Sequence, residues 1–127
     1  MNHVVLVGRL AENPTLTTTE SGKQVTTVSV AVTRNFKNPD GIYETDFIRC
    51  VLWNGIASNT SEYCHSGDVI GIKGRLQTSK YEDENKKTHY IMEVVAEKVT
   101  FLSSAKSKDE VTENNENKSS KKTKKVN

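Results

Sequence analysis

The chain has 127 residues, the length of one ordinary domain with a modest hydrophobic core. Fourteen valines, six isoleucines and fourteen threonines, against five alanines and six leucines, favour β-strands over helices. No apolar run is long enough to span a membrane, and no charged leader precedes the first one, Val4 to Val7. We therefore expect a cytoplasmic protein with neither a signal peptide nor a membrane helix.

The net charge of +2 is divided unevenly along the chain. Residues 1–102 contain eleven Lys and Arg and twelve Asp and Glu, which gives −1, whereas residues 103–127 contain seven Lys and four acids, which gives +3. The second segment has too few apolar side chains to offset the entropy of ordering it. We predict one domain, residues 1–102, followed by a disordered Lys-rich tail, residues 103–127. Because the domain is nearly neutral, only the placement of its charges can indicate a partner.

Three strand-like segments occupy the first half of the chain. The first, residues 3–10 (HVVLVGRL), ends where AENP breaks the apolar pattern. The second, residues 24–33, alternates valines with polar or small side chains. Residues 38–41 (NPDG) indicate a turn, because proline presets one dihedral angle and glycine accepts positive φ. The third strand follows at roughly residues 43–53.

A short helix is expected between the third and fourth strands, with Gly67 able to end its last turn. Four residues there recur at helical spacing: Ile56, Thr60, Tyr63 and Cys64. The fourth strand spans residues 68–81, and the fifth, residues 89–102, follows a polar loop. Five strands with one helix between the third and fourth is the order of an OB-fold, a five-stranded Greek-key barrel that binds oligonucleotides or oligosaccharides.

The third and fourth strands each have one continuously apolar parity, which we expect to pack inside the barrel. These interior residues are Ile48, Cys50, Leu52, Ile70, Ile72 and Leu76. The opposite parity then faces outward. It carries Phe47, Arg49 and Trp53 on the third strand and Lys73 and Arg75 on the fourth.

Aromatic side chains beside cations suit an unpaired nucleic-acid strand, since bases stack on ring faces while guanidinium and ammonium groups hold phosphates. Tyr81 beside Lys80, and Phe36 between Arg34 and Lys37, extend this pattern. The predicted nucleic-acid-binding residues are Arg34, Phe36, Lys37, Phe47, Arg49, Trp53, Lys73, Arg75, Lys80 and Tyr81.

Each feature also has a purely structural alternative. Phe47 and Trp53 also suit a second small core or a subunit contact, and the cations suit a solvated strand face. The repeated association of aromatics with outward cations on two strands favours a binding surface. We find no Ser-His-Asp set, paired carboxylates or metal-ligand spacing, so we expect no enzymatic activity, cofactor or metal. We interpret the three histidines, His3, His65 and His89, as structural or exposed residues. We expect the two cysteines, Cys50 and Cys64, to be reduced thiols.

Four ordered blocks resemble the bacterial single-stranded DNA-binding proteins: NHVVLVGRL followed by NP, DFIRCVLWNGIAS, SEYCHSGD and GIKGRLQTSKY. Together they cover nearly all of residues 1–102. The resemblance implies an OB-fold that assembles as a homotetramer, with single-stranded DNA wrapped over aromatic and basic residues. The stacking aromatics of that family correspond to Phe36, Phe47, Trp53 and Tyr81.

Three features differ from the family pattern. Many members have tryptophan where this chain has Phe36, Phe47 and Tyr81, so we expect these smaller rings to stack less extensively. Ser66 stands where a lysine commonly precedes the glycine. Typical members end in an acidic tip that docks replication and repair enzymes, whereas this chain ends KKTKKVN. We therefore do not expect docking by that route, and we hypothesise a mobile-element or accessory version whose basic tip contacts DNA.

The sequence thus predicts sequence-independent binding and protection of single-stranded DNA in replication, recombination and repair. The protein is expected to be a stoichiometric binder in the cytoplasm, associated with the nucleoid. The alternative is an accessory or primosomal OB-fold subunit whose exposed aromatics bind another protein. RNA binding also stays open, because stacking does not inspect the 2′-hydroxyl.

Overall fold

The computed structural model describes residues 1–105, within which the chain forms six strands and one helix. The elements are β1 (Val4–Leu10), β2 (Thr17–Thr18), β3 (Gln24–Lys37), β4 (Tyr43–Trp53), α1 (Asn54–Tyr63), β5 (Val69–Glu82) and β6 (Thr88–Ser103). The predicted tail lies outside the described residues from residue 106 onward. No helix in the described part of the chain is long and apolar enough to cross a membrane.

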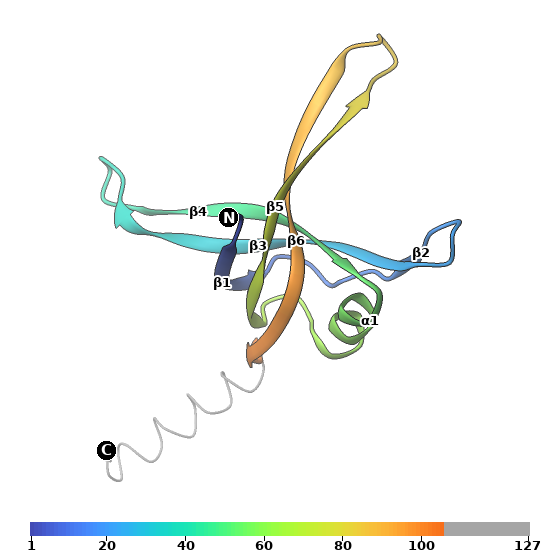
Figure 1. The fold of residues 1–127 in the computed structure, drawn as a ribbon. Coiled ribbons are helices and arrows are strands. Elements are labelled where there is room, and N and C mark those ends of the chain that lie inside the picture. The colour runs from blue at the N-terminus through green and yellow to red at the C-terminus, as the bar shows by residue number, and fades with distance from the viewer. Residues whose placement is uncertain (106–127) are drawn as a thin grey trace.

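The strands close into a barrel (Figure 1). They are ordered β1-β5-β6-β4-β3-β2, and β1 also pairs with β3, which joins the two sides of the sheet. The β4–β6 pair is parallel and the other pairs are antiparallel. Five strands make the barrel, while the two-residue β2 only extends the edge of β3. The predicted mostly β OB-fold, with its helix between the third and fourth long segments, is confirmed.

Alternate apolar side chains from the strands fill the barrel interior, as expected from the strand period. The fully buried ones include Leu10, Val28, Val30, Cys50, Leu52, Ile70, Ile72 and Val94. Burying each such side chain contributes roughly 1.5–3 kcal/mol. Barrel closure between β1 and β3 depends on Gly8, because a Cβ there would lie 2.4 Å from the carbonyl oxygen of Ala31. Helix α1 adds Ala57 to the same core cluster.

Three residues differ from their predicted surroundings. Leu76, predicted to be interior, is 43% exposed because β5 continues beyond its last pairing with β1, Val4 opposite Gly74. Val51 has the outward parity but is buried, because it lies beside the buried Val95 where β4 meets β6. Tyr63 is exposed, since the buried positions of α1 are Ala57 and Thr60.

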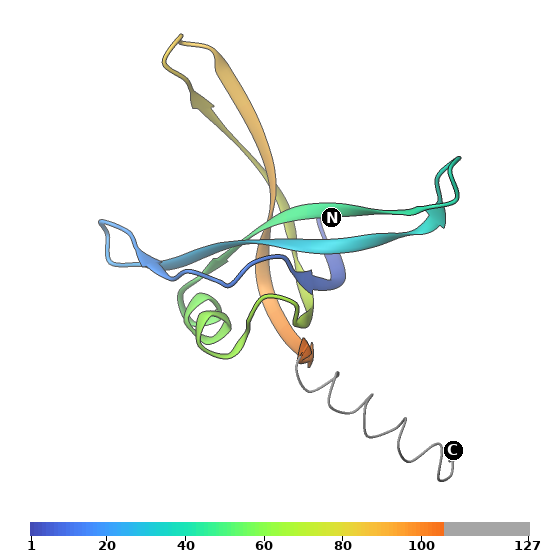
Figure 2. The same ribbon diagram turned by 180° about the vertical axis from the view of Figure 1, so that it is seen from behind.

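Two long hairpins extend from the barrel in different directions (Figures 1 and 2). We call residues 34–43 the β3–β4 arm and residues 76–92 the β5–β6 arm. The predicted NPDG turn ends the first arm. Gly41 has φ +78°, and the Asn38 side-chain oxygen accepts the N–H groups of Asp40 and Ile42 at 2.9 and 3.0 Å. Because β3 continues to Lys37, the candidate residues of this arm lie on a strand.

Candidate nucleic-acid interface

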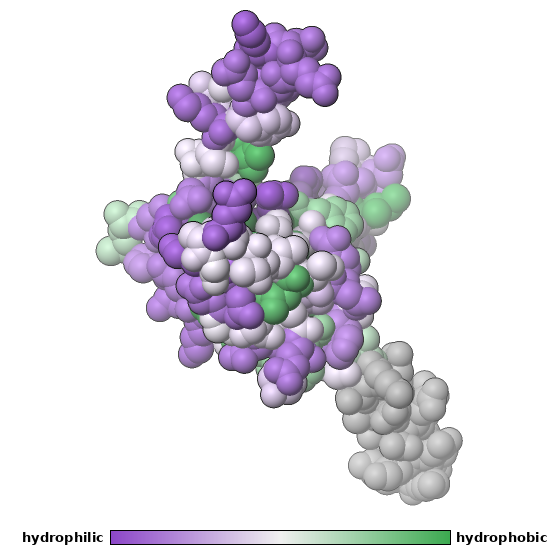
Figure 3. Space-filling view, turned by 90° about the vertical axis from the view of Figure 1, so that its right-hand side faces the viewer, coloured by the Kyte–Doolittle hydropathy of each residue, from purple (hydrophilic) through white to green (hydrophobic). Residues whose placement is uncertain are grey.

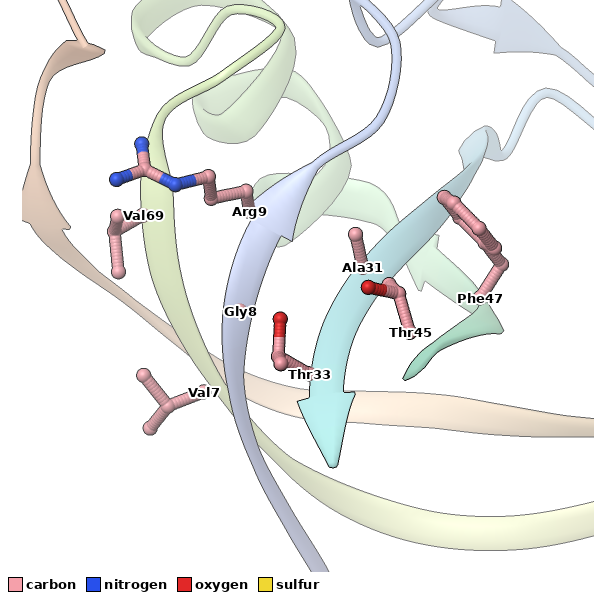
Figure 4. Close-up of a pocket in the computed structure, with 8 residues that line it drawn as sticks. All are labelled: Val7, Gly8, Arg9, Ala31, Thr33, Thr45, Phe47 and Val69. Carbon is pink, nitrogen blue, oxygen red and sulfur yellow. The ribbon is translucent and has the colours of Figure 1, made fainter. Parts of the chain in front are cut away.

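Phe47 lies on the outside of the barrel, with 67% of its surface exposed. The residue opposite it on β3 is Ala31, whose methyl group is too small to cover the ring. An open groove of about 510 Å³ runs beside it, lined by Val7, Gly8, Arg9, Ala31, Thr33, Thr45, Phe47 and Val69 (Figure 4). The predicted outward position of Phe47 is therefore confirmed, and one side of the ring borders a groove with a small-residue floor.

Trp53 is the last residue of β4 and is 37% exposed. It shares the outward parity of Phe47 six residues earlier, which places the two Cα atoms roughly 20 Å apart along the strand. Arg49 lies between them, and its Nε donates to Glu93 Oε2 at 3.0 Å. The Arg49 side chain still has 52% exposure, against 11% for Glu93. Strand β4 thus presents two aromatic rings with an anchored, accessible guanidinium between them.

Arg75 belongs to the same outward surface. In the strand register, Val51 of β4 lies beside Val95 of β6, which is opposite Arg75 of β5. Arg75 is therefore two strand spacings from β4, about 10 Å. Its Nη1 donates to Gln77 Oε1 at 3.2 Å. The structure brings together Phe47, Arg49, Trp53 and Arg75, which we call the β4 strip.

The β3–β4 arm carries Phe36 and two predicted cations in different settings. Arg34 makes a bidentate ion pair with Asp46, at 3.0 and 2.9 Å, and a further contact of 3.1 Å with Glu44. The hydrogen bonds between Arg34 and Asp46 raise the pKa of Arg34 and lower the pKa of Asp46. The Arg34 Cζ also lies 6.0 Å from the centre of the exposed Phe36 ring. Two carboxylates therefore balance the Arg34 charge.

Lys37 contacts an aromatic ring that the sequence analysis did not select. Its Nζ lies 5.7 Å from the centre of the Tyr43 ring, which is exposed. A signal for Tyr43 was available, because residues 43, 45 and 47 share one parity on the same strand. Phe36, Lys37 and Tyr43 thus add aromatic and cationic surface at the arm.

The β5–β6 arm separates two residues that the sequence analysis had grouped. Tyr81 is opposite His89 and shares the parity of Arg75, whereas Lys80 is opposite Tyr90 on the other face. A hollow of about 290 Å³ near the tip is lined by Lys80, Tyr81, Glu82 and Thr88. In the space-filling view the tip is hydrophilic, and paler side chains of intermediate hydropathy lie directly below it (Figure 3). Lys80 and Tyr81 thus have opposite parities on β5 but line the same hollow near the tip.

Lys73 lies apart from the aromatic residues. It is opposite Val5 on β1 and Lys98 on β6, and these three residues line a shallow hollow of about 230 Å³ with Val7 and Gly71. Its outward parity is confirmed by its exposure. The structure places it on the valine-rich outer face of β1 rather than beside the β4 strip.

Residues 1–102 match the family model described as the single-strand binding protein family. The chain belongs to this family. It is 45% identical over 101 residues to single-stranded DNA-binding protein B of Bacillus subtilis (strain 168), which covers 80% of this chain and 89% of that protein. It is 44% identical over 115 residues to single-stranded DNA-binding protein 2 of Listeria innocua serovar 6a, with 91% and 72% covered. The resemblance predicted from the sequence blocks is therefore confirmed.

A third relative matches over a similar length. Single-stranded DNA-binding protein 3 of Streptococcus agalactiae serotype V is 42% identical over 113 residues, which cover 89% of this chain and 82% of that protein. The matched length includes the barrel and both arms. Every candidate residue named above therefore lies within the part of the chain that defines its membership of this single-strand binding family.

Arg9 and His89 are candidate residues that sequence reasoning missed. Arg9 shares the outward parity of Val5 and Val7, but its Nη1 donates to Gly67 O at 2.7 Å. Figure 4 shows the guanidinium on the β5 side of β1, directed away from Phe47. His89 was read as structural or exposed, and only the β5–β6 register reveals that it stacks on Tyr81. Neither contact has a local sequence signal.

Proposed function

We propose that this protein binds single-stranded DNA without sequence preference and protects it, as a stoichiometric binder. The β4 strip carries this proposal, because it places exposed rings and guanidinium groups side by side in a chain of the single-strand binding family. Bases of an unpaired strand stack on such rings for about 1–3 kcal/mol each, whatever the base. Duplex DNA keeps its base faces covered and lacks this interaction.

The stacking residues proposed are Phe36, Phe47, Trp53 and Tyr81, which are exposed aromatics of the strip and the two arms. The proposed phosphate contacts are Arg34, Lys37, Arg49, Lys73, Arg75 and Lys80. Since Arg34 already holds two carboxylates, we assign it mainly to positioning Phe36. For each phosphate that the remaining cations neutralise, the slope of log K for binding against log salt concentration becomes more negative by about 0.7.

We further propose that the protein is a homotetramer. Strand β1 pairs with β5 from Val4 to Arg9, but with β3 only at Arg9 and Leu10, so its first half has an unpaired edge. On the outer face of the same strand, Val5 is 73% and Val7 56% exposed. An edge that pairs with a second copy, and an apolar face that packs on another pair, together give a closed tetramer.

The biological setting follows from the chemistry of the ligand. Unpaired DNA strands arise during replication, recombination and repair, so we propose that the protein acts in these processes in the cytoplasm, at the nucleoid. The proposed interaction requires no cofactor and makes no covalent change to the DNA. A contact between the Lys-rich C-terminal segment and DNA is part of this proposal.

A fluorescence titration tests the function. A thymine oligomer is expected to quench Trp53 strongly, whereas a duplex of matched length is expected to change the signal little. The Tyr63→Ala variant, which removes an exposed aromatic from α1 away from the strip, serves as the matched control and should bind like the wild type. Absence of binding to the oligomer would refute the proposal. Salt-insensitive binding to a protein partner in its place would support the accessory-subunit alternative.

A further inference from the structure

Near the tip of the β5–β6 arm, Tyr81 and His89 form a pair of stacked rings. The ring centres are 5.0 Å apart and the planes differ by 21°. The two residues are direct cross-strand partners, so the contact is a consequence of the strand register rather than of a loop conformation. Tyr81 nevertheless keeps 51% of its surface exposed. One side of the stack is therefore open to a ligand.

Asp83 fixes the histidine half of this pair. Its Oδ2 lies 2.7 Å from His89 Nε2, while its Oδ1 accepts the N–H groups of Asn85 and Lys87 at 2.9 Å each. These hydrogen bonds, above all the one with His89, lower the pKa of Asp83. Because the carboxylate is then ionised, the Nε2 atom must carry the hydrogen of the contact. One carboxylate thus caps the turn and orients the imidazole.

We propose that Tyr81 and His89 form one two-ring platform for a base of single-stranded DNA, so that His89 is a binding residue of the arm. This inference rests on the proposed function and adds a residue to its site. A ring that is already held in place loses less conformational freedom when a base stacks on it. The pair should therefore bind a base more tightly than a lone tyrosine does.

The experiment compares the full chain with three variants by titrating a labelled thymine oligomer. His89→Ala removes the stack, and its affinity is expected to fall about 3- to 10-fold, the factor typical of an aromatic pair. His89→Phe retains the second ring, and its affinity at pH 8 should stay within about twofold of the wild type. Tyr90→Ala, on the opposite face of the same arm, is the matched control and should leave binding unchanged.

The comparison of His89→Ala with His89→Phe separates a binding role from a structural one, because only the second variant keeps a ring that can stack on Tyr81. Retained quenching of Trp53 at saturation and an unchanged melting temperature would show that the barrel of each variant is intact.

Two results overturn the inference while leaving the proposed function in place. They are wild-type affinity in His89→Ala, and equal weakening in His89→Ala and His89→Phe. A wild-type protein that fails to bind the oligomer is a different result, because it refutes the proposed function itself. The two failures are therefore distinguishable in one set of titrations.

Discussion

Truncating Phe47 to alanine should weaken binding of single-stranded DNA strongly while barely affecting the fold. The ring is 67% exposed, so only about a third of the roughly 1.5–3 kcal/mol that full burial of a phenylalanine contributes is at stake, close to 1 kcal/mol or less. The lost base stack costs about 1–3 kcal/mol. Affinity should therefore fall roughly 5- to 150-fold. Since Ala31 leaves room opposite the ring, the larger indole of Phe47→Trp should bind more tightly than the wild type.

Anisotropy of a labelled thymine oligomer at fixed salt measures these affinities, and urea unfolding of the same samples measures stability. Tyr63→Ala provides the control for removal of an exposed ring elsewhere. The reasoning fails if Phe47→Ala binds with wild-type affinity. It fails equally if the unfolding free energy of this variant is lower by several kcal/mol, because the ring would then be part of a core rather than an exposed stacking surface.

Four further predictions follow from the barrel and its surface. Gly8→Ala should lower the unfolding free energy by at least about 1–3 kcal/mol, measured in urea, because its Cβ would lie 2.4 Å from Ala31 O. Lys73→Glu should make the salt slope shallower by about 0.7, because it removes a proposed phosphate contact. It should also lower the sedimentation coefficient, because it places a carboxylate beside Val5 on the face that we propose packs in the tetramer. Truncation after Ala105 should reduce affinity and flatten the salt slope, and unchanged values would reject tail contact. The Cys50 thiol, whose pKa burial raises to about 11, should resist alkylation at pH 8 until the protein is unfolded.

The sequence predicted what local periodicity determines. Alternation on β4 and β5 identified Cys50, Leu52, Ile70 and Ile72 as interior residues, because a strand with one buried face repeats every second residue. The turn at Asn38–Gly41 was predictable for a similar reason, since its proline and glycine act within four residues.

The sequence pattern did not predict the environments of residues that depend on a strand distant in the sequence. Leu76 fits the interior pattern of β5, but β1 has already ended at that level, so nothing closes over it. Lys80 and Tyr81 have opposite parities on β5, and only the pairing with β6 shows that Tyr81 is opposite His89 and Lys80 is opposite Tyr90. The ion pair of Arg34 with Asp46 joins residues that become neighbours only across the β3–β4 arm.

The ion pairs explain how a domain with a charge of −1 suits a polyanionic ligand. Glu44 and Asp46 are held by Arg34, and Glu93 is held by Arg49. These carboxylates do not face the DNA unpaired, but the same pairs also weaken the cations that would attract phosphates. Stacking must then supply a larger share of the binding free energy than charge does. We therefore expect a shallower salt dependence than the number of Lys and Arg residues on the surface implies, and a strong dependence on each exposed ring.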